Sequence, residues 1–348
     1  RFNPVLSAGI RWNVSEENFM RRFGWLSNLT LKASYGTQGK APDISPNLIA
    51  NFNIAPDILT GEQYLSIKNL PNKDLKWEKT RSFNGGIELS ILDNRIYGSI
   101  DYYYKKTTDL LQYKQTPSST GIEQILSNSG SVINKGFEAN MKVFAIQSKD
   151  FSLTFGGNIS FNKNEICDFG KEPMFPNSIY NSMRPYALAD GHSIGAFYGW
   201  THDGIWQSRD EVVNSHQFKT QYPNYKADSS DAAAEEIIRR DWVGEIKYKD
   251  LDGDGFITDK DQDWIGDASP DFYYGFSLDL NWKNIDFSIL FQGVEGNDIF
   301  NMNSLRFYDV GTTQNKPYYV YEQSWSVNPQ TAVAPKNFYY TGRDIRFS

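Results

Sequence analysis

The chain has 348 residues, a net charge of −7, 15% aromatic residues and one cysteine, Cys167. The negative charge argues against binding to nucleic acid, which needs a basic surface, and one cysteine excludes both an internal disulfide and a multi-cysteine zinc site. The mean hydropathy is −0.55, and no stretch approaches the roughly 20 apolar residues of a transmembrane helix. A helical membrane protein is thereby excluded. A transmembrane β-barrel is not, because its alternating strands are polar on average.

Several segments alternate between apolar and polar side chains, which predicts β-strands with one apolar face. Such segments lie at 29–35, 87–91, 137–143, 151–161 and 274–282. In 151–161 every odd-numbered residue is apolar or glycine. These odd positions are expected to face lipid, with Phe155 near the middle of the membrane.

Short and long connections between these strands follow one another in strict alternation. Tight turns are predicted at 92–95, 147–150 and 283–285, and long joins at about 37–76, 106–131 and 164–271. An up-and-down barrel in an outer membrane has this asymmetry, with short periplasmic turns and long extracellular loops. The sequence therefore predicts an all-β fold, a transmembrane antiparallel up-and-down β-barrel.

Aromatic residues gather near the ends of the predicted strands, at Trp12, Tyr35, Trp77, Tyr102, Tyr103, Tyr104, Phe151, Phe161, Tyr273, Tyr274 and Trp282. Tyr and Trp favour the headgroup level of a membrane because an apolar ring carries a polar atom that reaches water. We interpret this group as an interfacial girdle. Three acids that alternate with apolar residues, Glu88, Asp101 and Glu138, are expected to face a polar barrel lumen.

The longest join, about 164–271, is too long for a bare loop and is predicted to be a large extracellular insertion. A helix is expected over 230–240, with Ser230 as its N-cap, Asp231 in the first turn and Arg239 and Arg240 in the last. Residues 194–206 are a candidate strand region. If the insertion contains strands, the alternation of turns and loops requires an even number of them.

Residues 250–261 match the spacing of a calcium-binding loop. Asp250, Asp252 and Asp254 occupy the first three ligand positions, Gly255 allows the sharp turn, and the carbonyl of Phe256 is the next ligand. Asp261 stands where EF-hand loops usually have a bidentate Glu, and this shorter acid resembles the calcium loops of dockerins. The alternative is an acidic turn exposed to solvent. Bound Ca²⁺ is expected to stiffen the loop and to take no part in chemistry.

No motif supports catalysis, and the chain is not expected to be an enzyme. His192, His202 and His216 are scattered, with no metal-ligand spacing between them. The adjacent pair His202 and Asp203 has no marked nucleophile, and the sequence contains no phosphate-binding glycine loop or nucleophile elbow.

Several motifs resemble those of SusC/RagA-type TonB-dependent transporters of Bacteroidetes. They occur in family order over nearly the whole chain, at 74–80 (DLKWEKT), 94–111 (NRIYGSIDYYYKKTTDLL), 128–138, 196–200 (AFYGW), 250–261, 270–276 (PDFYYGF) and 291–301. The resemblance implies that residues 1–348 form a later part of a 22-stranded barrel. Both ends are interpreted as cuts, with the plug, the N-terminal domain and the last strands expected outside this sequence.

The resemblance also implies a function in the cell outer membrane, as a multi-pass barrel in contact with lipid. The expected activity is import of oligosaccharides or oligopeptides, with a SusD-like surface lipoprotein as partner and with energy from TonB–ExbB–ExbD through the plug. The sequence leaves the substrate-contact residues unknown. Two alternatives stay open: a TonB-dependent siderophore or cobalamin receptor, and a secreted calcium-dependent carbohydrate-binding β-protein. A co-purifying SusD-like lipoprotein would argue against the first, and solubility without detergent would support the second.

Overall fold

The computed structural model describes residues 4–41, 51–56, 62–69, 72, 74–116, 124–175, 186–226, 232–301, 315, 317–322 and 325. The chain forms two compact units. The first, called the sheet unit, comprises Arg1–Pro173, Leu188–Ile194 and Ser269–Gly296. The second, called the insertion unit, comprises Met174–Ala187, Gly195–Ala268 and Asn297–Ser348.

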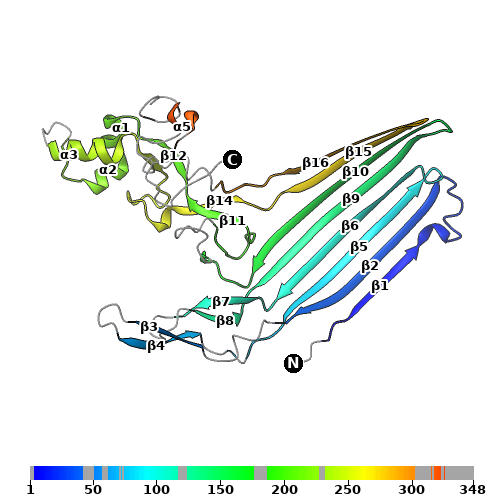
Figure 1. The fold of residues 1–348 in the computed structure, drawn as a ribbon, viewed down its shortest axis with the longest axis horizontal. Helices are drawn as coiled ribbons and strands as arrows, with labels where there is room; N and C mark the ends of the chain where they lie inside the picture. Colours follow the sequence, from blue (N-terminus) through cyan, green and yellow to red (C-terminus); the bar gives the residue numbers. More distant parts are fainter. Residues whose placement is uncertain are drawn as a thin grey trace. The chain divides into compact units, whose positions relative to one another are not determined.

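The sheet unit contains one antiparallel sheet of eight strands in the order β1-β2-β5-β6-β9-β10-β15-β16 (Figure 1). The strands are β1 (Ser7–Asn13), β2 (Leu26–Lys40), β5 (Glu78–Ile91), β6 (Ile96–Thr108), β9 (Ser131–Gln147), β10 (Phe151–Cys167), β15 (Phe272–Trp282) and β16 (Ile285–Glu295). Each strand pairs with the next of these eight along the chain. The up-and-down order predicted from the sequence is therefore confirmed.

The connections also follow the prediction. Strands β5 and β6, β9 and β10, and β15 and β16 are joined by tight turns, and η1 (Val14–Glu16) lies between β1 and β2. In the β5–β6 turn the residues Leu92, Asp93 and Asn94 have φ near +55°, +55° and +63°. The longer joins carry hairpins of their own, β3 (Asn51–Pro56) with β4 (Gln63–Asn69) and β7 (Leu111–Gln115) with β8 (Gln124–Asn128).

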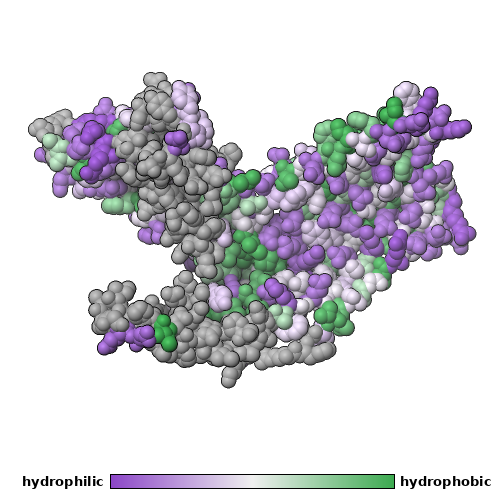
Figure 2. Space-filling view, in the orientation of Figure 1, coloured by the Kyte–Doolittle hydropathy of each residue, from purple (hydrophilic) through white to green (hydrophobic). Residues whose placement is uncertain are grey.

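Strand register gives the sheet an apolar face and a polar face, because residues opposite each other share a face and neighbours along a strand do not. One row across five strands reads Leu31, Ile87, Ile100, Ala139 and Ile159. The adjacent row reads Lys32, Gly86, Asp101, Glu138 and Ser160. Phe155 lies opposite Val143 and Leu278 on the apolar face, as predicted. Figure 2 shows hydrophilic and neutral colours over much of the visible side of this sheet.

The predicted aromatic girdle is wrong at two residues. Tyr102 and Tyr104 lie on the apolar face, but Tyr103 lies between them on the polar face, opposite Gly136. Tyr273 is opposite Ser160 and also belongs to the polar face. The reason is the alternation of a strand, since three consecutive tyrosines cannot all face lipid.

The insertion unit combines small sheets with short helices. Strand β11 (Ala196–Trp200) pairs with β14 (Gln262–Asp267), and β12 (His202–Ile205) pairs with β13 (Ile246–Tyr248). The candidate strand region 194–206 is therefore two strands. Four strands within the described part of the insertion agree with the expected even number. They do not join the large sheet, in which β10 pairs directly with β15.

Helices α1 (Arg209–Asn214), α2 (His216–Gln221), α3 (Ala232–Ile237) and the π-helical η3 (Ile238–Trp242) complete the insertion unit, and α5 (Tyr318–Glu322) follows later. Their buried core consists of Trp206, Val212, Val213, Phe218 and Ile238. The predicted helix over 230–240 is confirmed from Ala232 and continues to Trp242; its expected cap Ser230 and Asp231 lie outside the described residues. Across the described part of the chain, no helix combines the length and the apolar character needed to span a bilayer.

Candidate functional site

A network of ion pairs crosses four strands on the polar face of the sheet. Arg11 Nη2 on β1 lies 3.0 Å from Glu88 Oε2 on β5. Lys32 Nζ on β2 lies 3.3 Å from Glu88 Oε1 and 2.8 Å from Asp101 Oδ1 on β6. Glu88 and Asp101 therefore lie on the polar face together, as expected for lumen-facing acids. All four side chains are partly exposed, so solvent screens the network.

Gly86 on β5 lies beneath the Lys32–Asp101 ion pair. Strand β5 separates β2 from β6, and Gly86 lies opposite both Lys32 and Asp101. A Cβ at this position would meet Asp101 Oδ1 and would lie 2.5 Å from Lys32 Cε. A residue with a side chain would therefore require Asp101 and Lys32 to shift, whereas glycine leaves the path between them open.

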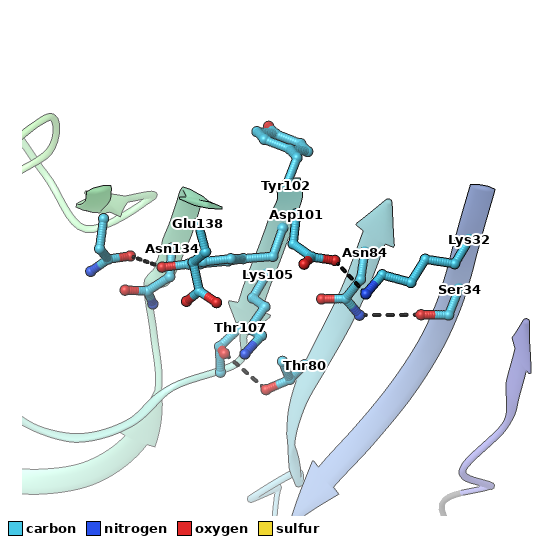
Figure 3. Close-up of a pocket in the computed structure, with 12 residues that line it drawn as sticks. Lys32, Ser34, Thr80, Asn84, Asp101, Tyr102, Lys105, Thr107, Asn134 and Glu138 are labelled. Carbon is cyan, nitrogen blue, oxygen red and sulfur yellow. Dashed lines mark hydrogen bonds and ion pairs between the residues drawn. The ribbon is translucent and has the colours of Figure 1, made fainter. Parts of the chain in front are cut away.

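A polar cavity of about 800 Å³ opens on the same face (Figure 3). Its lining is dominated by hydroxyl, amide and charged side chains of the polar face, from Lys32, Ser34, Thr80, Asn84, Asp101, Tyr103, Lys105, Thr107, Asn134, Glu138 and Asn162. Tyr102 also borders the cavity, but its side chain lies on the apolar face. Several of these groups bond to each other, as Thr80 and Thr107 do through hydroxyl oxygens 2.8 Å apart. Strands β2, β5, β6, β9 and β10 each contribute to the wall.

Two charged groups of this cavity have no ion-pair partner among the described residues. In the part of the chain that the structure describes, no cation lies within ion-pair distance of Glu138 and no acid within that distance of Lys105, whose ammonium stacks over the Tyr103 ring at 5.3 Å. Two lysines and two acids line the cavity, so it carries no formal net charge. The arrangement can bind a polar solute of low net charge through many paired donors and acceptors.

The predicted calcium loop brings three of its acids together. Asp250, Asp252 and Asp254 each offer a carboxylate oxygen, and these atoms lie within 4.8 Å of one another. Asp250 accepts hydrogen bonds from the N–H groups of Gly253 (2.7 Å) and Gly255 (2.8 Å). Gly255 has φ +85°, as expected of the sharp turn. Phe256 follows directly, its N–H donating to Asp254 Oδ1 at 2.8 Å and its ring half-exposed.

Asp261 is not part of this cluster and is fully buried. Its Oδ1 accepts from the Leu251 N–H at 2.9 Å and its Oδ2 from the Thr258 N–H at 2.7 Å, so one side chain ties the two ends of the loop together. Burial alone would raise the pKa of Asp261, but these backbone donors outweigh it and lower the pKa. Its role as a calcium ligand stays a prediction, whereas its bracing role is visible.

Helix α2 and strand β11 hold the loop from outside. His216 Nε2 lies 3.0 Å from the Gly253 carbonyl oxygen, and Gln221 Nε2 donates to the Gly255 carbonyl at 3.1 Å. Trp200 Nε1 donates to the Thr258 carbonyl at 2.7 Å. These contacts hold the backbone on both sides of the acids.

Sequence reasoning missed a second polar cluster in the insertion unit. The Arg209 guanidinium makes hydrogen bonds of 2.6–3.0 Å to both carboxylate oxygens of Glu235, and the Tyr225 hydroxyl donates to the same carboxylate at 2.7 Å. The Arg209 hydrogen bonds, followed by that from Tyr225, lower the pKa of Glu235 to about 2. The three residues are 10 to 26 positions apart, and no local spacing marks them.

A sheet with one apolar and one polar face, tight turns at one end and long loops at the other is the wall of an outer-membrane β-barrel. Residues 2–233 match the family described as "TonB dependent receptor-like, beta-barrel", and the chain belongs to this family. The protein is therefore located in the outer membrane, as predicted.

Individual relatives agree with this assignment. The chain is 32% identical over 315 residues to "TonB-dependent receptor P26" of Formosa agariphila, covering 88% of this chain and 29% of that protein. It is 27% identical over 317 residues to "TonB-dependent receptor SusC" of Bacteroides thetaiotaomicron, covering 89% and 28%. The structure titled "Structure of the RagAB peptide transporter" shares its fold with a TM-score of 0.70 at 23% identity, covering 99% of this chain and 34% of that one. The resemblance to SusC/RagA-type proteins is thus confirmed, and the chain spans about a third or less of each relative.

Proposed function

We propose that the protein containing this chain imports oligosaccharides or oligopeptides across the outer membrane. The observation that carries the proposal is the polar wall of the sheet, with a cavity of about 800 Å³ lined by amides, hydroxyls and a balanced set of charges. Sugar hydroxyls and peptide groups both pair with such donors and acceptors. The likeness to SusC and to the RagAB peptide transporter supports the same class of solute.

The proposed activity is transport, and no bond of the solute is broken. Glu138 and Lys105, which have no ion-pair partner among the described residues, would contact the passing solute, and Asn84, Asn134 and Asn162 would exchange hydrogen bonds with it. We further propose that TonB–ExbB–ExbD supplies the energy and that a SusD-like lipoprotein acts as partner at the cell surface. Purification of the tagged full-length protein from native membranes tests the partner, since a lipoprotein should accompany it in stoichiometric amount.

The test of import uses the full-length protein in cells that lack the native gene. Uptake of fluorescent oligosaccharides and oligopeptides is measured for the wild type and for the double variant Lys105→Ala, Glu138→Ala. The matched control, Lys142→Ala with Asp279→Ala, removes one base and one acid from the polar face outside the cavity.

We expect uptake of one of the two solute classes by the wild type, a fall of about tenfold or more in the cavity variant, and little change in the control. Uptake of a ferric siderophore or cobalamin, with neither oligosaccharide nor peptide transported, would overturn the proposal in favour of the alternative receptor class.

We also propose that the 250–261 loop binds Ca²⁺. The acids fit the ion, because three carboxylates converge within 4.8 Å and oxygen ligands are those that Ca²⁺ prefers. Asp250, Asp252 and Asp254 would hold the ion, with the Phe256 carbonyl and Asp261 as the further predicted ligands. Its contribution would be to relieve repulsion among the acids and to stiffen the loop.

A further inference from the structure

The apolar face of the sheet ends in a row of basic residues near the long loops. On four neighbouring strands, the last aromatic residue of this face is followed two positions further outward by Arg or Lys. These pairs are Phe83 and Arg81 on β5, Tyr104 and Lys106 on β6, Phe137 and Lys135 on β9, and Phe161 and Lys163 on β10. We call Arg81, Lys106, Lys135 and Lys163 the basic rim.

The height of the basic rim in the membrane follows from strand geometry. Phe151 and Phe161 lie on the apolar face of β10, ten residue steps apart. With a rise of about 3.3 Å per residue and a tilt of about 40°, those steps span roughly 25 Å, which is the height of the apolar band of such barrels. Lys163 is two steps beyond and lies about 5 Å above the band. That level holds the lipid headgroups and not the acyl chains.

The register makes the basic rim electrostatically unfavourable by itself. Arg81 lies directly opposite Lys106, and Lys135 lies directly opposite Lys163. Like charges directly opposite each other on neighbouring strands destabilise a sheet. Negative groups close to these residues would therefore stabilise it.

The acids of the chain neutralise only part of this charge. Glu165 lies 3.5 Å from Lys135, and Asp168 lies 3.6 Å from Lys106. Within the described residues, neither Arg81 nor Lys163 has an acid at ion-pair distance. Four basic residues thus have two acidic partners, which leaves two positive charges without a partner among the described residues. These charges lie at the headgroup level of the extracellular leaflet, because the long loops are on that side.

We propose that the basic rim binds the phosphate groups of an outer-leaflet lipid such as lipid A. The Arg81 guanidinium can hold a phosphate through paired hydrogen bonds, and the lysines add point charges beside it. The aromatic residues just below, Phe83, Tyr104, Phe137 and Phe161, offer an apolar surface to the acyl chains. One lipid would thereby be held by its headgroup and by its tails, across β5 to β10.

The experiment uses the full-length protein in detergent, with bound lipid counted by native mass spectrometry after addition of purified lipid A. The variant carries Arg81→Gln, Lys106→Gln, Lys135→Gln and Lys163→Gln. The control carries Arg21→Gln, Arg95→Gln, Lys149→Gln and Lys283→Gln, which removes four bases at the short-turn end of the sheet. We expect lipid A affinity to fall by at least about tenfold in the variant and to stay near the wild-type value in the control.

Two further measurements keep the proposal open to refutation if the fourfold variant fails to fold. The wild type should bind dephosphorylated lipid A at least about tenfold more weakly than lipid A. The milder double variant Arg81→Gln, Lys163→Gln should lose part of the affinity. Equal binding of the two lipids by the wild type, or an unchanged affinity in the variants, would overturn the proposal. Full displacement of lipid A by inorganic phosphate would also overturn it, in favour of a site for free phosphate.

Discussion

The Tyr103 side chain on β6 passes over Gly136 on β9, and its hydroxyl donates a hydrogen bond to Asn162 Oδ1 on β10, 2.8 Å away. A Cβ on Gly136 would collide with the Tyr103 ring and hydroxyl and with the Phe161 carbonyl oxygen. Lys32 reaches Asp101 past Gly86 in the same way. On the polar face, glycines on intervening strands therefore let side chains connect strands that share no backbone hydrogen bonds.

Replacing Gly136 should show how much this connection stabilises the barrel. We expect Gly136→Val to lower the free energy of unfolding by about 1–3 kcal/mol, because the new side chain displaces Tyr103 and crowds the backbone of β10. Tyr103→Phe should cost only about 0.5–1.5 kcal/mol, since it removes the hydrogen bond alone. Denaturant titration of the full-length protein in detergent measures both. Gly24→Ala is the control, because a Cβ there has no neighbour within 4 Å. A valine variant as stable as this control would contradict the account.

Lys32 pairs with two acids of the ion-pair network, Glu88 and Asp101, so replacing it tests how much the network stabilises the sheet. Lys32→Met leaves Asp101 without its cation, while Glu88 keeps only Arg11. Because the groups are partly exposed, we expect a loss of about 1 kcal/mol or less at low ionic strength that shrinks as salt is added. The same titration at two salt concentrations measures it, with Lys149→Met in a tight turn as control. A loss independent of salt would point to packing and not to charge.

The sheet could be predicted from the sequence because its signals are local. Alternation at 151–161 fixes which residues share a face, and the turn at 92–95 fixes which strands are neighbours. The same alternation assigns Tyr103 to the polar face, although clustering by residue type placed it in the girdle. The contacts that define the site are not local. Lys32 and Asp101 are 69 positions apart in the sequence but form an ion pair in the fold. No local sequence pattern around either residue indicates its partner. The loop position of Asp261 predicts a ligand, but its burial against the Leu251 and Thr258 amides depends on how the loop folds.

The facing of β10 can be tested with adjacent substitutions. Phe155 lies on the apolar face, opposite Leu278, and Thr154 lies on the polar face, opposite Asp279. We expect Phe155→Lys to cost about 2–4 kcal/mol, since a charge would enter the middle of the lipid-facing band. Thr154→Lys should be far milder, because its ammonium would lie near Asp279 on the lumen side. Denaturant titration in lipid vesicles measures both, and equal costs would refute the assigned facing.

The two roles proposed for the acids of the 250–261 loop predict different responses to calcium. Asp252→Asn with Asp254→Asn should abolish any protection of the loop by Ca²⁺, since these side chains would hold the ion. Asp261→Asn should make the loop sensitive to protease with or without Ca²⁺, because it weakens the bonds to the Leu251 and Thr258 amides. Limited proteolysis of the full-length protein, with calcium or with a chelator, measures both effects. Wild-type cleavage that is identical in the two conditions would argue against a bound ion.

The ion pair of Arg209 and Glu235 should make the insertion unit sensitive to acid. The Glu235 pKa falls from 4.5 to about 2 on folding. The resulting stabilisation is complete above pH 4.5 and is lost as the pH falls towards 2, since the unfolded chain takes up the proton first. Hydrogen exchange of α1 and α3 should therefore be slower in the wild type than in Glu235→Gln at pH 6, and the difference should shrink between pH 4.5 and 2. The control is Glu236→Gln, whose partner Arg239 is 75% exposed and whose effect should be smaller at every pH. A difference between wild type and Glu235→Gln that persists unchanged to pH 2 would show that the carboxylate charge is not what stabilises the helices.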